Sequence, residues 1–369
     1  MNMGKMGLLL GVTFATGLLR ADLTLARRSR PADYVIVRAA DAKPSEVYAA
    51  EELKKFVWQI SGVDLPIATD AESLPEKAVL LGRTRYTDKL LPRQPDWKSL
   101  GDDGFVLKTQ GRHLLIAGDG ARGTLYGVYD VLERFGGCRW YSSKFSVIPE
   151  NPVLSVPELD EVQRPAFVSR EPYWFDMHNG DFAVRNKVNG SSIRIAEKHG
   201  GKIRFGGGLF VHTFELLCPV DEFFDAHPEY FSEIDGKRIR NHPQLCLTNP
   251  DVVKLVTQRV LERIRKDPSA KIFSVSQNDW RNPCTCPKCR TTDDFEESHA
   301  GTMITFVNQV AEAVEKEFPD VWIETLAYQY TRKPPKHVRP RRNVVPRLCS
   351  IECDFLYPLD KSACEENRK

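Results

Sequence analysis

Strand-like and helix-like segments alternate along the second half of this chain. Two of them have clear helical periodicity, Asp251–Arg265 and Met303–Phe318. Such alternation is typical of parallel β/α units, which close into a barrel or form an open doubly wound sheet. No Gly-x-Gly-x-x-Gly turn opens a helix, so the pattern does not indicate a nucleotide-binding fold. Six strands are predicted, at Ala166–Arg170, Leu209–His212, Gln244–Thr248, Lys271–Gln277, Val321–Tyr328 and Val344–Glu352.

The first half of the chain has a different pattern, which predicts a small α+β domain over residues 30–148. Helices are expected at Ser45–Ile60 and Gly123–Phe135, each followed by a glycine stop. Several prolines then fall within a short polar segment, so residues 149–164 are predicted to form a stiff linker. The strands of this domain are predicted at Tyr34–Arg38, Leu65–Ala68, Ala78–Leu81, Phe105–Thr109 and His113–Ala117.

The predicted second domain, residues 165–369, is short for a closed barrel. Eight βα units typically need about 250 residues, and only six strands are predicted here. The expected fold class is therefore α/β, with a small N-terminal α+β domain followed by an incomplete (β/α)8 barrel. The chain is expected to be a C-terminally truncated form that lacks the seventh and eighth βα units.

The N-terminus predicts export. Lys5 gives a positive start, Met6–Leu19 carries no charge, and Ala21 is a small residue for cleavage, so residues 1–21 read as a secretory signal. That run is too short to span a bilayer and no later stretch is long enough, so no membrane span is expected. The protein is expected to be secreted or periplasmic. A formal net charge of +2 gives no reason to expect a nucleic-acid partner.

The nine cysteines are interpreted in the light of export. Cys284, Cys286 and Cys289 lie close together in a turn-rich loop. In an oxidising compartment such a group is predicted to brace the loop through disulfides. A structural metal is the second interpretation, with His299 as the nearest candidate for a fourth ligand, and redox chemistry is the third. No metal or cofactor is assigned to the candidate site.

Polar and aromatic residues follow the predicted strands. Asp279 ends the fourth strand beside an amide and an indole, and Glu352 and Asp354 end the sixth. Active sites of barrels gather from the carboxyl ends of strands, so these three carboxylates are the predicted catalytic residues. Taken singly, an Asp at this place commonly only caps the following loop. The residues predicted to bind substrate are Arg170, His212, Asn278, Trp280 and Tyr328.

Three motifs of the first half carry a family resemblance. They are Ala49–Leu53, Ile60–Ile67 and the segment from Gly118 to Gly127. Together they resemble the accessory domain that precedes the barrel in β-hexosaminidases and α-glucuronidases. The segment Arg164–Arg170 is similar to the start of the hexosaminidase barrel. This resemblance implies that Arg170 binds the sugar.

The mature chain as a whole resembles the bacterial domain-of-unknown-function family 4838. The distinctive blocks occur in order, at His212–Phe214, His227–Phe231, Gln244–Pro250, Ser274–Asp279 and Ile351–Phe355. The glycosidase resemblance implies that Asp279 is the general acid after the fourth strand. It also implies that Glu352 or Asp354 is a second carboxylate. Hexosaminidases have Asp-Glu where this chain has Asn278-Asp279, which disfavours N-acetyl-assisted hydrolysis and favours a uronic acid or neutral sugar.

The function expected from these features is that of an exported O-glycosyl hydrolase that acts on a poly- or oligosaccharide with paired carboxylates. In this interpretation the acid is Asp279, and Asn278 orients it or a sugar hydroxyl. The alternative is a non-catalytic carbohydrate-binding or structural barrel protein, in which the polar strand ends bind sugar without a facing pair of carboxylates. The two differ in whether Asp279 and Glu352 or Asp354 share one cleft.

Overall fold

The computed structural model describes residues 22–358 and 364–368. The predicted secretory signal at residues 1–21 lies outside them. The chain divides into two compact units, Met1–Lys202 and Ile203–Lys369, here called unit 1 and unit 2. Both combine helices with strands, so the fold is mixed α/β. Among the described residues, no helix is long and apolar enough to cross a membrane.

Unit 1 is built on a six-stranded mixed sheet. Its four strands β6, β4, β2 and β3 are parallel, and β5 and then β10 join antiparallel at the β6 edge. The apolar residues of β4 are buried on both faces, as expected for an interior strand. In sheet order, the strands are β10 (Asp160–Gln163), β5 (Phe105–Gln110), β6 (His113–Ala117), β4 (Ala78–Leu81), β2 (Val35–Arg38) and β3 (Ile67–Thr69).

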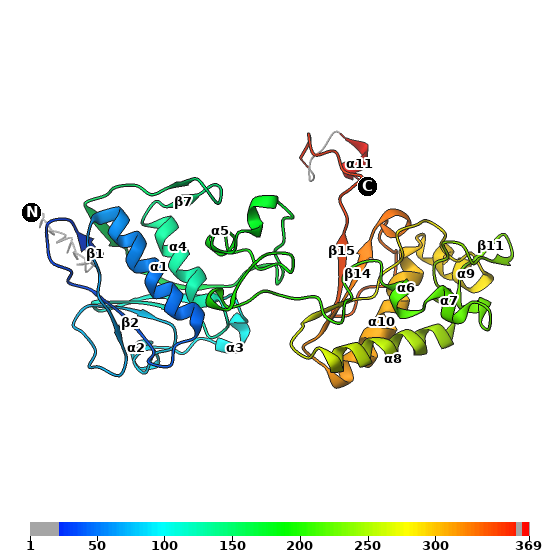
Figure 1. Ribbon diagram of the computed structural model, residues 1–369, viewed down its shortest axis with the longest axis horizontal. Coiled ribbons are helices and arrows are strands. Elements are labelled where there is room, and N and C mark those ends of the chain that lie inside the picture. The colour runs from blue at the N-terminus through cyan, green and yellow to red at the C-terminus, as the bar shows by residue number, and fades with distance from the viewer. Residues whose placement is uncertain (1–21, 359–363, 369) are drawn as a thin grey trace, which may run out of the picture. The chain divides into compact units, whose positions relative to one another are not determined.

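Two long helices, α1 (Pro44–Ser61) and α4 (Gly123–Arg134), pack on each other and on one face of this sheet (Figure 1). The short helices α2 (Thr87–Leu90) and α3 (Trp97–Leu100) belong to a smaller core on the other face. Helix α1 ends at Gly62, whose φ of 75° is left-handed and suits glycine. Helices α1 and α4 and the predicted strands of the first domain are confirmed within two residues at their ends, whereas α2 and α3 were not predicted.

The segment predicted to be a linker contains two strands. Strand β9 (Val153–Val156) pairs with β1 (Leu23–Arg27), and β10 extends the main sheet, so residues 149–164 are part of unit 1. The prolines flank these strands at sheet edges, where no amide donor is missed.

The first predicted barrel strand, Ala166–Arg170, is not a strand and lies in unit 1. The other elements are β7 (Arg139–Trp140), β8 (Ser146–Val147), η1 (Phe175–His178), α5 (Gly180–Arg185) and η2 (Glu197–His199).

Unit 2 has a three-stranded parallel sheet, β13 (Ile272–Ser274), β14 (Trp322–Ala327) and β15 (Val344–Leu348), in that order. Helices α8 (Pro250–Lys266) and α10 (Ala300–Glu317) pack side by side, and α10 also contacts β14 and β15 (Figure 1). These three strands and two helices confirm the predicted βα alternation for this part of the chain. The barrel as a whole stays a prediction.

Two further predicted strands of unit 2 are not regular strands. The chain before Leu209–His212 starts to pair with β13 through a parallel bridge from Phe205 to Ile272. Gly207 and Gly208 then adopt positive φ values, and this left-handed backbone ends the pairing. In the segment Gln244–Thr248 only Leu245 makes a bridge. Unit 2 also contains α6 (Phe214–Leu217), α7 (Val220–Phe223), η3 (Pro228–Tyr230), β11 (Glu233–Ile234), β12 (Lys237–Arg238), α9 (Pro287–Glu296), η4 (Gln329–Thr331) and α11 (Glu365–Arg368).

Candidate active site

Asp279 lies where the chain leaves the core of unit 2 beyond the carboxyl end of β13. The four residues before it, Val275 to Asn278, are buried, whereas the side chain of Asp279 is 60% exposed. The extended chain is held to the neighbouring strand by the bond from Val275 N–H to the Glu324 carbonyl, 2.8 Å. A ligand in solution can therefore reach the Asp279 carboxylate while its backbone remains anchored.

Two predicted substrate-binding residues meet Asp279. The Tyr328 hydroxyl, just past the end of β14, donates a hydrogen bond of 3.0 Å to Asp279 Oδ1. Nε2 of His212 lies 3.8 Å from the same oxygen, and the His212 and Tyr328 rings have centroids 5.8 Å apart. The structure thus brings three residues together from three separate segments of unit 2. One carboxylate, one phenol and one imidazole share a site at the strand ends.

The backbone of His212 is in a conformation that non-glycine residues rarely adopt, with a φ of 54°. Its Nδ1 donates to the Gln277 carbonyl, 2.9 Å away, which leaves Nε2 on the side of Asp279. With the Nδ1 proton committed, Nε2 accepts a hydrogen bond when the ring is neutral and donates one when it is protonated. Rare backbone conformations concentrate at functional sites, and this one fixes the direction of the ring.

A second carboxyl group is buried in the sheet, in the middle of β14. Glu324 has a side chain only 3% exposed, and its Oε1 lies 2.7 Å from Nε of Arg347 on β15. Burial raises the pKa of Glu324, and the charge of Arg347, a hydrogen bond from Ser274 and the charge of His212 offset part of that rise. His212 therefore lies beside the exposed Asp279 and also bears on the pKa of the buried Glu324.

Glu352 is connected to the same site through Tyr328. A hydrogen bond from Gln329 lowers the pKa of Tyr328, but burial and the carboxylates of Asp279 and Glu352 raise it overall. Glu352 Oε2 also lies 3.8 Å from Nη1 of Arg332. Asp354 has a local role instead, because its Oδ1 accepts from the backbone N–H of Leu356. Strand β15 ends at Leu348, so the prediction that these two carboxylates end the sixth strand is wrong. Glu352 is the one whose charge bears on Tyr328, and the catalytic roles of both stay predictions.

Asn278 and Trp280 flank Asp279 but point elsewhere. The buried Asn278 amide accepts from Glu215 N–H (3.0 Å) and donates to the Pro243 carbonyl (3.2 Å). The Trp280 indole donates to the same carbonyl, 2.8 Å away, and its ring packs against His242. Both side chains therefore fix the loop. Their predicted contacts with a sugar stay predictions.

Arg170 belongs to unit 1. Its Nη2 lies 2.7 Å from Oδ2 of Asp103, and its Nε donates to the Lys187 carbonyl, 2.7 Å away. Asp103 also pairs with the buried Arg122, so Arg170 is part of an ion-pair cluster. Its guanidinium is thereby occupied within unit 1, and its predicted sugar contact stays a prediction.

Three residues of the site were missed from the sequence. Glu324 is the charged residue of a strand that is apolar apart from Thr325, and that contrast is a signal that could have identified it. Its partner Arg347 follows only from the register of β14 with β15. Gln244 accepts from Asn278 N–H (2.9 Å), and its amide donates to the Asn278 and Trp280 carbonyls at 3.0 and 2.6 Å. No spacing rule predicts such a clamp.

The carboxylates of this site do not form a metal-ligand group. Among the described residues, the group of side chains with the spacing to hold a metal ion is formed by four cysteines of unit 2. One of the four, Cys284, lies in the loop that follows Asp279, but Asp279 is not part of the group, which is treated below. The chemistry available at Asp279 is therefore that of its own carboxylate, an imidazole and a phenol, which suits proton transfer and hydrogen bonding to hydroxyl groups.

Known proteins resemble this chain in part. Over 135 residues it is 27% identical to "Probable alpha-glucuronidase A" of Aspergillus terreus, a match that covers 37% of this chain and 16% of that protein. A solved family GH115 4-O-methyl-α-glucuronidase, described with specificity for decorated arabinogalactans, superposes with a TM-score of 0.46 at 11% identity. That superposition covers 87% of this chain and 45% of that one. A GH20 β-N-acetylhexosaminidase of Streptomyces coelicolor gives a TM-score of 0.41 at 11% identity, covering 94% and 70%.

Two family models match the chain. Residues 21–131 match the N-terminal region of glycosyl hydrolase family 67. Residues 140–368, more than half of the chain, match a domain of unknown function, DUF4838. Both matches confirm the resemblances that the sequence motifs indicated. The chain belongs to the DUF4838 family.

Proposed function

We propose that this protein is a glycoside hydrolase in which Asp279 acts as the general acid. The observation that carries the proposal is the meeting of Asp279, Tyr328 and His212 at the carboxyl ends of parallel strands. A solvent-accessible carboxylate with a phenol and an imidazole beside it can protonate a glycosidic oxygen and bind sugar hydroxyls. The match of residues 21–131 to a glycosyl hydrolase family supports this assignment.

In this proposal Glu352 is the second carboxylate. The charges of Glu352 and Asp279 both raise the pKa of Tyr328, whose hydroxyl donates a hydrogen bond to Asp279. Glu352 would stabilise positive charge at the sugar or activate the attacking group, with Arg332 3.8 Å away setting its orientation. The similarity of part of the chain to a probable α-glucuronidase favours a substrate with a carboxylate, such as a uronic acid. The export predicted from the N-terminus makes an extracellular or periplasmic polysaccharide the expected source.

One observation favours a second candidate function, sugar binding without catalysis. A general acid is usually shielded from water by apolar groups. The Asp279 side chain is 60% exposed, and Trp280 packs on His242 rather than on Asp279. A binding protein needs the same hydroxyl and carboxylate partners but no shielded acid. The two functions differ in turnover, so one assay separates them.

The test is hydrolysis of aryl glycosides and oligosaccharides, including uronic-acid glycosides, by wild-type protein and by Asp279→Asn. This substitution keeps the shape but removes the acid, and kcat/KM should fall about 10²–10⁴-fold. Asp320→Asn is the matched control, because Asp320 is an exposed aspartate before β14, at the opposite end of the strand. Hydrolysis that Asp279→Asn leaves unchanged would remove Asp279 from the mechanism. Saturable sugar binding with no turnover of any substrate would establish the second candidate.

A further inference from the structure

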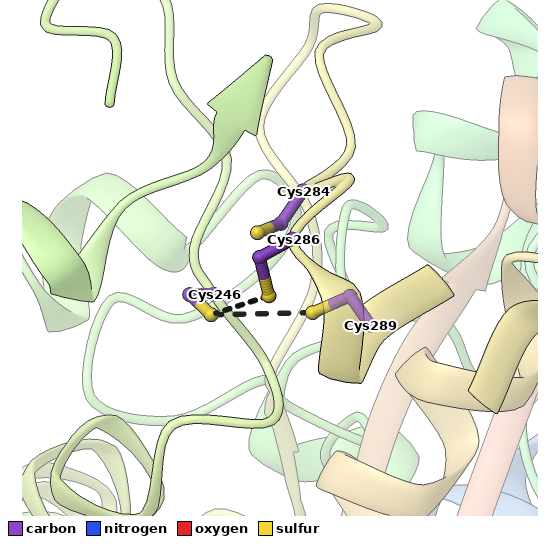
Figure 2. Close-up of side chains that lie close together, drawn as sticks. All are labelled: Cys246, Cys284, Cys286 and Cys289. Atoms are coloured by element: carbon purple, nitrogen blue, oxygen red, sulfur yellow. Dashed lines mark hydrogen bonds between the residues drawn. The ribbon is translucent and has the colours of Figure 1, made fainter. Parts of the chain in front are cut away.

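Four cysteines of unit 2 gather at one point (Figure 2). Cys246, Cys284, Cys286 and Cys289 are at most 6% exposed, and their Sγ atoms all lie within 4.8 Å of one another. Cys246 Sγ is 3.7 Å from that of Cys286 and 3.9 Å from that of Cys289. They form a buried cluster of their own, separate from the apolar core of unit 2. Figure 2 shows the four sulfur atoms pointing toward a common centre.

These distances fit a tetrahedral metal site. Zinc binds thiolate sulfur at about 2.3 Å, so two sulfurs of one tetrahedral site are about 3.8 Å apart. The measured separations of 3.7 and 3.9 Å lie on either side of that value. A disulfide brings two sulfurs to about 2.05 Å and leaves other pairs much farther apart. Here one sulfur, that of Cys246, is almost equally distant from two others, and the four cysteines of the cluster are free thiols.

The segments that supply the sulfurs are shaped for metal binding. Cys284 and Cys286 come from the loop before α9, and Cys289 from the first turn of that helix, which begins at Pro287. This knuckle presents three sulfurs from six consecutive residues. Cys246 is 40 residues before Cys286 and belongs to another loop. A metal ion here would hold together two loop segments that are not paired with each other as strands of a sheet.

Polar groups around the sulfurs can stabilise thiolate charge. The backbone N–H of Glu233 donates to Cys284 Sγ at 3.4 Å, and Nη1 of Arg238 donates to the same sulfur at 3.6 Å. The Thr248 hydroxyl lies 3.2 Å from Cys289 Sγ. Buried thiolates around a divalent ion leave net negative charge, so N–H and guanidinium donors beside them lower its cost. Such outer partners are a regular feature of metal–sulfur sites.

We propose that Cys246, Cys284, Cys286 and Cys289 bind one structural zinc ion. Sulfur fills all four positions, and a closed four-thiolate site is structural rather than catalytic. The inference replaces the predicted disulfides and also the predicted fourth ligand. His299 is occupied elsewhere, because its Nδ1 lies 2.6 Å from Oδ2 of Asp293. The proposal does not rest on glycosidase activity.

The experiment measures zinc in the full chain, purified without chelator or added metal. Elemental analysis should find about one zinc per chain, and the intact mass should show the four cysteines as unoxidised thiols. Cys246→Ser should lose most of the zinc. Cys349→Ser is the matched control, because Cys349 is a half-buried cysteine of the same unit outside the cluster, and it should keep a full complement. Cobalt substituted for zinc should give the intense visible and near-ultraviolet bands of a tetrahedral thiolate site.

Several outcomes would overturn the proposal. One is a metal-free protein whose mass is lower by four hydrogens, which would mean two disulfides. The others are iron bound in place of zinc, and full zinc retention by Cys246→Ser. If that variant does not fold, titration of the wild-type protein with a mercurial decides instead. Zinc release in proportion to the blocking of four thiols supports the site. Release that is complete before four thiols have reacted, or no release, contradicts it.

Discussion

Unit 1 and unit 2 are each stabilised internally by a different kind of contact. Unit 1 surrounds a six-stranded sheet with helices and short turns, and its buried charges are paired across elements, as in Asp103 with Arg122 and Glu52 with Arg185. The described part of unit 2 has a parallel sheet of three short strands, and side chains such as Gln244 and Cys246 hold its long loops. A regular sheet stabilises a scaffold, whereas side-chain clamps position loops. The candidate active site belongs to the second kind of structure.

The largest expected effect that separates the two units comes from Asp103→Ala in unit 1. Asp103 is the carboxylate between the guanidinium groups of Arg122 and Arg170, and Arg122 is almost fully buried. Removal of Asp103 leaves the buried Arg122 with only the more distant carboxylate of Asp102, 3.7 Å away, and should cost about 3–5 kcal/mol. The transition of unit 1 should fall by roughly 10 °C in calorimetry while that of unit 2 stays in place.

The matched control for this substitution is Asp33→Ala, in the same unit. Asp33 pairs with Lys77 at the surface, and surface pairs contribute little, so the transition temperature should hardly change. A single transition that moves as a whole in Asp103→Ala would show that the units unfold together. The contrast between them would then be structural but not thermodynamic.

The contrast also explains what the sequence could predict. In unit 1 the local sequence pattern predicts the elements. Helix α1 has its apolar residues at helical spacing and ends at Gly62, and the turn between β5 and β6 has Gly111 at a φ of 60°. In unit 2 Asp279 and Tyr328 were found because each follows an apolar strand. Local periodicity was sufficient for these elements.

The features that were missed depend on contacts distant in sequence. The sequence around Arg170 is typical of the end of a barrel strand. In the structure Arg170 forms an ion pair with Asp103 and belongs to unit 1. Cys246 joins a knuckle 40 residues away, and no spacing rule links them. The role of Glu324 depends on Arg347, which lies on the next strand two residues beyond Val345, the residue in register with Glu324. Such pairings are set by tertiary packing, which a single sequence does not display.

A smaller effect is expected from breaking the clamp in unit 2 with Gln244→Ala. Gln244 is buried and makes three hydrogen bonds to the backbone on either side of Asp279. Their loss leaves buried backbone groups unpaired and should cost about 2–4 kcal/mol. We expect the unit 2 transition to fall while unit 1 is unaffected. If the proposed function holds, kcat/KM should fall as well, because Asp279 loses its fixed position.

Gln258→Ala is the control for the clamp. Gln258 is on α8 and bonds only to Glu262 at the surface, so its truncation should change neither stability nor turnover. A Gln244→Ala protein as stable as the wild type would mean that other contacts position the loop around Asp279. In that case the difference between sheet and clamp would not account for the site.

The smallest expected effect is a difference in pH dependence between the units. Burial raises the pKa of Glu324 in unit 2, so the folded state binds its proton more tightly than the unfolded state does. Stability of unit 2 should therefore fall as pH rises above the ordinary glutamate value of 4.5, and level off above the raised pKa. The slope is at most about 1.4 kcal/mol per pH unit for one proton. Glu324→Gln should remove it in chemical denaturation followed across pH.

Unit 1 should respond to pH in the opposite sense through Glu161. Hydrogen bonds from Arg134 lower the pKa of Glu161, so its contribution is present above the ordinary glutamate value of 4.5 and is lost as pH falls through the lowered one. Because the two shifts have opposite signs, falling pH strengthens unit 2 through Glu324 above about pH 4.5 and weakens unit 1 through Glu161 below it. Parallel slopes in both units, or a Glu324→Gln profile identical to that of the wild type, would contradict the assignment of Glu324 as a buried acid with a raised pKa.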